Sequence, residues 1–76
     1  MGYAISVCTW GPDRDVAARC LEPTLYMNGY NVNSVTKHEN GEWELDISRY
    51  GIYDVVFYEY GEKIILARLE WRHTPG

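Results

Sequence analysis

The sequence predicts an α+β fold, in which one short helix packs on a four- to five-stranded, mostly antiparallel sheet. Three observations support this class. Apolar residues recur at helical spacing in the segment before Gly29, and after it they recur at every second position. The pairs Asn40-Gly41 and Gly61-Glu62 separate apolar runs, as hairpin turns do. A chain of 76 residues fits one domain, 1–76, with the element order β-α-β-β-β-β.

The first strand is expected over residues 3–10, "YAISVCTW", because this stretch is rich in β-branched and aromatic residues. Its alternation places Tyr3, Ile5 and Val7 on one side of the strand. A Gly-Pro pair follows and breaks the strand. The chain is then free to change direction and begin a helix.

The helix is expected over residues 13–22, with Asp13 as its N-cap. Because a proline disfavours helical geometry in the residue before it, Pro23 predicts an end or a kink at Glu22. One more turn is expected over residues 24–29. The apolar positions at helical spacing are Val16, Ala17, Cys20 and Leu21.

Four strands in an antiparallel meander are expected to follow. Their segments are residues 30–38, 42–48, 53–60 and 63–72. A two-residue turn at Gly61-Glu62 would place Tyr58 opposite Ile65 and Val56 opposite Ala67. The Asn-Gly turn leaves two registers open: a two-residue turn sets Lys37 opposite Glu44, and a three-residue turn with Gly41 in a bulge sets it opposite Trp43.

A row of carboxylates alternates with bulky apolar residues along one of these strands. Trp43, Leu45 and Ile47 are expected to face the core, which directs the intervening acids toward solvent. One interpretation is a solvated face that also prevents edge-to-edge aggregation. The other is an acidic stripe that imitates a phosphate backbone and occupies the basic groove of a nucleic-acid-handling protein. The acids concerned are Glu42, Glu44 and Asp46.

The last hairpin is apolar on both faces, as the runs "VVFY" and "IILA" show. One short helix can cover a single face. Either the sheet curls and closes the second face within the chain, or part of that face is presented to another protein. We prefer the second interpretation. The residues assigned to this second face are Tyr53, Val55, Phe57, Ile64 and Leu66, and together with the acidic row they form the expected partner-binding site.

Several classes of function are disfavoured. Eleven acidic against seven basic residues give a net charge of -4, which does not suit direct binding of nucleic acid. No sheltered carboxylate pair or activated nucleophile can be recognised, so we expect no enzyme and no cofactor. The N-terminal segment has no signal-peptide pattern and no stretch is long enough to span a membrane, so a cytoplasmic protein is expected. Metal binding is not expected, because Cys8, Cys20, His38 and His73 lack the spacing of zinc ligands.

In size, acidity, aromatic content and lack of catalytic residues, the chain resembles the broad class of small inhibitor proteins carried by phages and mobile elements, including anti-CRISPR proteins. The resemblance is one of composition and assigns a role to no single residue. We therefore expect a viral, non-enzymatic inhibitor or adaptor that binds a larger protein through its acidic strand face and exposed tyrosines, and that blocks a nucleic-acid-binding site. The alternative is a homodimeric structural or accessory module, in which a second copy covers the exposed sheet face.

Overall fold

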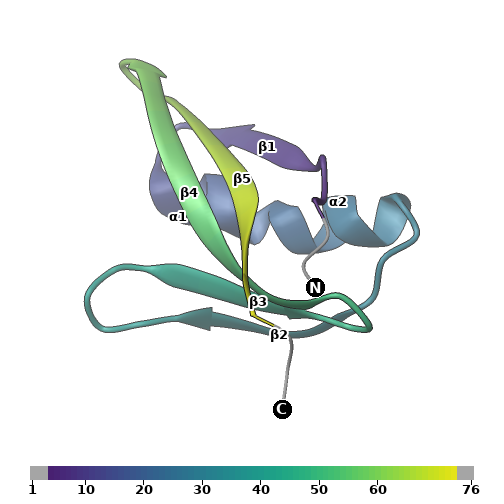
Figure 1. The fold of residues 1–76 in the computed structure, drawn as a ribbon. Coiled ribbons are helices and arrows are strands. Elements are labelled where there is room, and N and C mark those ends of the chain that lie inside the picture. The colour runs from purple at the N-terminus through teal and green to yellow at the C-terminus, as the bar shows by residue number, and fades with distance from the viewer. Residues whose placement is uncertain (1–3, 74–76) are drawn as a thin grey trace.

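The fold is α+β, with two short helices on one side of a curled, five-stranded antiparallel sheet (Figure 1). The computed structural model describes residues 4–73. Within them the elements are β1 (Cys8–Gly11), α1 (Arg14–Arg19), α2 (Leu21–Met27), β2 (Val32–Lys37), β3 (Trp43–Ile47), β4 (Gly51–Gly61) and β5 (Ile64–His73). The predicted class and the antiparallel sheet are therefore confirmed, while several details differ.

The strands lie in the spatial order β1-β5-β4-β3-β2, which the order along the chain does not reveal. β1 pairs with β5, so the first strand of the chain lies beside the last one. β1 is also shorter than the predicted strand over residues 3–10. Its ladder begins at the Cys8–Arg68 pair, although Ile5 and Val7 are buried as the alternation predicts. Tyr3 lies outside the described residues.

The predicted single helix is two helices that meet at Cys20, so the expected break at Glu22 is wrong. Pro23 falls in the first turn of α2. Backbone N–H groups in the first turn make no hydrogen bond within the helix, so a proline there removes none. It is therefore tolerated inside the helix. Asp13 is the N-cap of α1, and its side chain accepts a hydrogen bond of 2.9 Å from the backbone N–H of Val16.

The core lies between the helices and the inner face of the sheet. Trp43, Leu45 and Ile47 are buried there, as the alternation in β3 predicts. The helices contribute Ala17, Ala18, Leu21 and Leu25, and the remaining buried apolar residues of the cluster are Ile5, Val7, Tyr53, Val55, Ile65, Ala67 and Leu69. In Figure 1 the β4–β5 ribbon rises away from the β2–β3 hairpin, as strong twisting of a sheet produces, and both helices lie behind the sheet, on the same side of it.

The β2–β3 turn has three residues, with Gly41 in a left-handed conformation at φ 87°. The backbone N–H of Gly41 donates to the carbonyl of His38 at 2.9 Å and closes the turn. Lys37 therefore lies opposite Trp43, the second of the two registers left open by the sequence. Its ammonium binds Asp15 of α1 at 2.9 Å, so it does not neutralise the acidic row.

The β4–β5 register differs by one residue from the prediction. The turn residues are Glu62 and Lys63, because Gly61 already pairs with Ile64, and a bulge lies between Glu59 and Gly61. Phe57 consequently lies opposite Ala67, where Val56 was expected. A shift of one residue exchanges the faces of a strand. Tyr53, Val55 and Phe57 therefore share the inner face with Ile65, Ala67 and Leu69, and Ile64 and Leu66 point the other way.

Candidate protein-binding surface

The face of the sheet opposite the helices, here called the outer face, carries aromatic side chains at one end and charged side chains at the other. The register aligns Trp10 of β1, Leu66 of β5 and Tyr58 of β4 in one row across three strands. The next row contains Cys8, Arg68 and Val56. Side chains that face each other across neighbouring strands share a face, so these rows build a continuous surface.

An exposed apolar surface covers the end of the outer face near the β4–β5 turn. We call it the aromatic patch and define it as Trp10, Tyr58, Tyr60, Ile64 and Leu66. Trp10 is 53% exposed, Tyr60 62% and Ile64 47%. The rings of Trp10 and Tyr60 pack against each other with centroids 5.4 Å apart and planes at 51°. Large apolar groups gathered in this way on a small protein are typical of an interaction surface.

Tyr58 is held in place by Arg68 on the neighbouring strand. The Arg68 guanidinium donates two hydrogen bonds to the Tyr58 hydroxyl, from Nε at 3.1 Å and from an Nη at 2.8 Å. These bonds to Tyr58 raise the pKa of Arg68, and nearby Glu70 adds to the effect. The guanidinium carbon also lies 5.3 Å from the Tyr58 ring centroid. The phenol ring is thereby fixed at the edge of the aromatic patch.

The charged end of the outer face is a network of both signs. Arg72 of β5 donates to Glu44 of β3 at 2.8 Å and also to Asp54 of β4. His38 Nε2 lies 3.0 Å from the same Glu44 carboxylate. Hydrogen bonding by His38 and then by Arg72 lowers the pKa of Glu44 below its ordinary value of 4.5, and burial opposes the shift. The bond to Asp54 raises the pKa of Arg72, which stays protonated.

The acidic row predicted from the sequence is therefore partly neutralised. Glu44 is half-buried and pairs with Arg72 and His38. Glu42 is exposed, and its carboxylate accepts from the Asn40 side chain at 2.6 Å. Asp46 is half-buried and lies 3.4 Å from the Asn33 amide nitrogen. A uniform acidic stripe was expected, and the structure places a mixed-charge network there instead.

Three of the predicted partner contacts lie on the core side of the sheet. Tyr53 is fully buried, Val55 is 9% exposed, and half-buried Phe57 packs against the core with the Arg14 guanidinium 5.3 Å from its ring centroid. The one-residue shift in register removes them from the outer face. Exposed Ile64 and half-buried Leu66 do reach it. Trp10, Tyr58 and Tyr60 were not named among the predicted contact residues. Their common face depends on the pairing of β1 with β5 and on the shifted register of β4 with β5.

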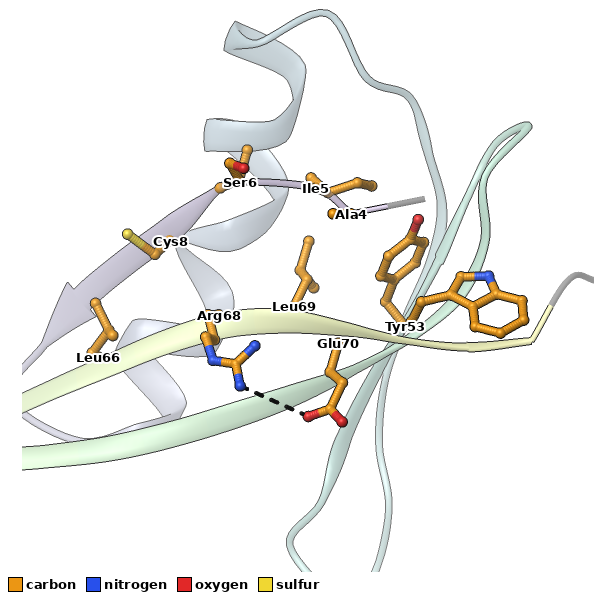
Figure 2. A pocket seen from close by; sticks show the side chains of 11 residues that line it. Ala4, Ile5, Ser6, Cys8, Tyr53, Leu66, Arg68, Leu69 and Glu70 are labelled. Carbon is orange, nitrogen blue, oxygen red and sulfur yellow. Dashed lines mark ion pairs between the residues drawn. The ribbon is translucent and has the colours of Figure 1, made fainter. Parts of the chain in front are cut away.

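A groove of about 740 Å³ lies between the N-terminal segment 4–8 and β5 (Figure 2). Figure 2 shows Leu69 pointing into it toward the N-terminal segment, while Arg68 and Glu70 point to the opposite side and form an ion pair of 3.9 Å. The groove is lined by Ala4, Ile5, Ser6, Val7, Cys8, Tyr53, Leu66, Arg68, Leu69, Glu70 and Trp71.

Within residues 4–73, no three His, Cys, Asp or Glu side chains come close enough together to hold a metal ion. Cys8 and Cys20 are free thiols. In the same part of the chain, neither helix has the length and apolar character to cross a bilayer. Comparison of the chain with family models, curated proteins and solved structures gives no match.

Proposed function

We propose that this chain is a small, non-enzymatic inhibitor or adaptor that binds a larger protein through the aromatic patch. The observation that carries the proposal is the exposure of Trp10, Tyr58, Tyr60 and Ile64 on one continuous face. Tryptophan and tyrosine dominate binding energy when they are buried at the centre of an interface. Both occur here on strands that pair with β5, so little backbone entropy is lost when a partner binds them.

The charged end of the outer face supplies the rim of this interface. The chain carries a net charge of -4, and the acids of the row lie on the same face as the aromatic patch. A basic surface on the partner would therefore be attracted at long range, and the rate of association would fall with added salt. Sites that bind nucleic acid are basic for the same electrostatic reason. This supports blocking of such a site as the inhibitory action.

The proposal is tested by affinity capture from host lysate with matched variants. The double variant Trp10→Ser and Tyr60→Ser should lose the captured protein, because it removes two central rings of the aromatic patch. The control is Met27→Ser, since Met27 is 86% exposed at the end of α2, away from the outer face. Equal capture by the patch variant and the control would overturn the proposal. A captured nucleic-acid-binding protein should also lose its nucleic acid when the chain is added.

A homodimeric accessory module is the alternative function, since a second copy could bury the same aromatic patch. Sedimentation velocity at low micromolar concentration distinguishes the two. A dimer that dissociates in the Trp10→Ser, Tyr60→Ser variant would favour the module, and a monomer would favour the inhibitor or adaptor. The variant Glu42→Lys, Asp46→Lys tests the charged rim separately. It should weaken capture at low salt and have little effect at high salt.

A further inference from the structure

We propose that the groove beside β5 binds one extended peptide segment of a partner protein, which adds a strand to the sheet beyond Arg68. This binding mode would supply backbone hydrogen bonds in addition to side-chain contacts. The edge 69–73 lies beyond the aromatic patch along β5, although Leu66 of the patch also lines the groove. Peptide binding at this edge does not require the function proposed above. Three features of the groove support it.

The first feature is an incomplete ladder. β1 pairs with β5 only from Cys8 opposite Arg68 to Gly11 opposite Ile65. β5 continues past this point to His73, and there it pairs with β4 on its other side. Among residues 4–73, the stretch 69–73 has no strand on the β1 side. A strand edge of this kind presents backbone donors and acceptors at a spacing that matches another extended chain.

The second feature is the facing wall. Residues 4–7 continue from β1 but leave the ladder, and this segment lines the groove on the side opposite β5 (Figure 2). The groove is thus closed on two sides, with a volume of about 740 Å³. If the β5 strand of a second copy entered the groove, the β4 strand paired with it would collide with the segment 4–7 on the opposite side of the groove. A single extended segment has no such neighbour, so the shape favours a peptide over dimerisation through this edge.

The third feature is the chemistry along β5. Residues opposite Leu69 and Trp71 in an added strand would point toward the core side, where Ile5 and Leu69 are buried. The residue opposite Glu70 would point to the outer face. Glu70 lies opposite another acid, Asp54, and its ion pair with Arg68 is long at 3.9 Å. A basic residue is therefore preferred at the centre, which gives the pattern apolar, Lys or Arg, apolar.

The probe is a phage library of linear peptides about seven residues long, enough to span the five-residue edge with flanks. Panning on the full chain should enrich peptides with an apolar-basic-apolar core. A synthetic copy of the best peptide, once bound, should slow hydrogen exchange of the backbone amides within residues 69–73. Protection elsewhere on the chain, or selected peptides without the alternating pattern, would overturn the proposal.

Two variants test the chemistry against matched controls. Glu70→Lys should weaken the selected peptide about fivefold and favour an acidic central residue on reselection, because it replaces an attractive cross-strand pair with a repulsive one. Glu62→Lys makes the same charge change in the exposed β4–β5 turn and should leave binding unaltered. Equal binding by wild type and Glu70→Lys would contradict the proposed register and with it the added strand.

Ser6→Trp should fill the groove from its exposed wall and abolish peptide binding. Thermal unfolding of this variant verifies that it folds, and Glu70→Lys remains informative if it does not. The Trp10→Ser, Tyr60→Ser variant should bind the peptide as wild type does. Loss of peptide binding in that variant, with Ser6→Trp still binding, would place the peptide on the aromatic patch and overturn the groove proposal.

Discussion

Trp10 in β1 packs against Tyr60 near the end of β4, with 5.4 Å between the ring centroids. The two residues are far apart in the sequence and do not belong to paired strands, since β5 lies between β1 and β4. The ladder between β4 and β5 contains a bulge between Glu59 and Gly61, and Tyr60 lies within this bulge. The contact thus joins the first strand to the far end of the β4–β5 ribbon.

A double-mutant cycle measures this contact. Trp10→Ala, Tyr60→Ala and the double variant should give a coupling free energy of about 0.5 kcal/mol in urea unfolding, at the low end for aromatic pairs because both rings are half-exposed or more. Each single substitution should lower the free energy of unfolding only slightly, but it should weaken the binding of the partner protein strongly. Coupling near zero would mean that the two rings do not stabilise each other.

Gly11→Ala should destabilise the fold by roughly 1–3 kcal/mol in thermal unfolding, as overpacking does. A Cβ at Gly11 would lie 2.7 Å from the backbone nitrogen of Ala17 and 3.0 Å from a Val16 methyl. Backbone atoms cannot rotate away, so β1 and α1 would have to separate. The control is Gly29→Asn, since Gly29 has φ 87° and open space around it, and asparagine tolerates that conformation. A neutral Gly11→Ala would show that the two elements are loosely packed.

Trp43→Phe should change the free energy of unfolding by less than about 1 kcal/mol, while Trp43→Ala should cost about 3–5 kcal/mol. Trp43 is 4% exposed, and within the described residues its indole N–H has no hydrogen-bond partner. Phenylalanine removes this unsatisfied donor, which offsets the lost ring volume. It also retains a ring for the cations of Arg19 and Lys37, each 5.6 Å from the indole centroid. A loss in the Phe variant as large as that in the Ala variant would contradict this account.

Glu44 should make stability depend on pH in the acid range. Its pKa is lowered in the folded state by hydrogen bonds from His38 and Arg72, so the native protein holds the carboxylate ionised more readily than the unfolded chain. The stabilisation is complete above the ordinary value of 4.5 and is lost as pH falls through the lowered folded pKa. Urea unfolding at several pH values should show a shallower acid decline for Glu44→Gln. An unchanged decline would exclude this carboxylate as its cause.

The sequence predicted those parts of the fold that depend on local pattern. The alternation of Trp43, Leu45 and Ile47 is sufficient to identify a strand with one buried face. Asp13 could be identified as an N-cap because its short side chain can accept a hydrogen bond from the first turn of the helix. The position of β1 beside β5 depends on contacts across the whole chain, which local periodicity does not contain. The helix does not break at Glu22, because a proline in the first turn of a helix is compatible with its geometry.

The candidate site was predicted less well, for a reason confined to the β4–β5 turn. Gly61-Glu62 fits a two-residue turn, but Lys63 adopts a left-handed φ of 60° and the turn moves forward by one residue. Nothing about a lysine signals this conformation. The shift then reversed the faces assigned to β5 relative to β4, so Tyr53 was assigned to the surface and Tyr58 was not. One turn residue thus determined which aromatic groups are available for binding.

The adjacency of β1 and β5 also has a consequence for synthesis of the chain. The ladder of residues 8–11 cannot form until residues 65–68 have been synthesised, and most of the chain lies between these two segments in the sequence. Contacts so distant in sequence close slowly, because the intervening loop loses entropy before it gains contacts. On the ribosome, the apolar residues of the helices would stay uncovered until nearly the last strand has emerged. A chain that ends before residue 65 should therefore leave β1 without its partner strand and fail to fold, as circular dichroism would show.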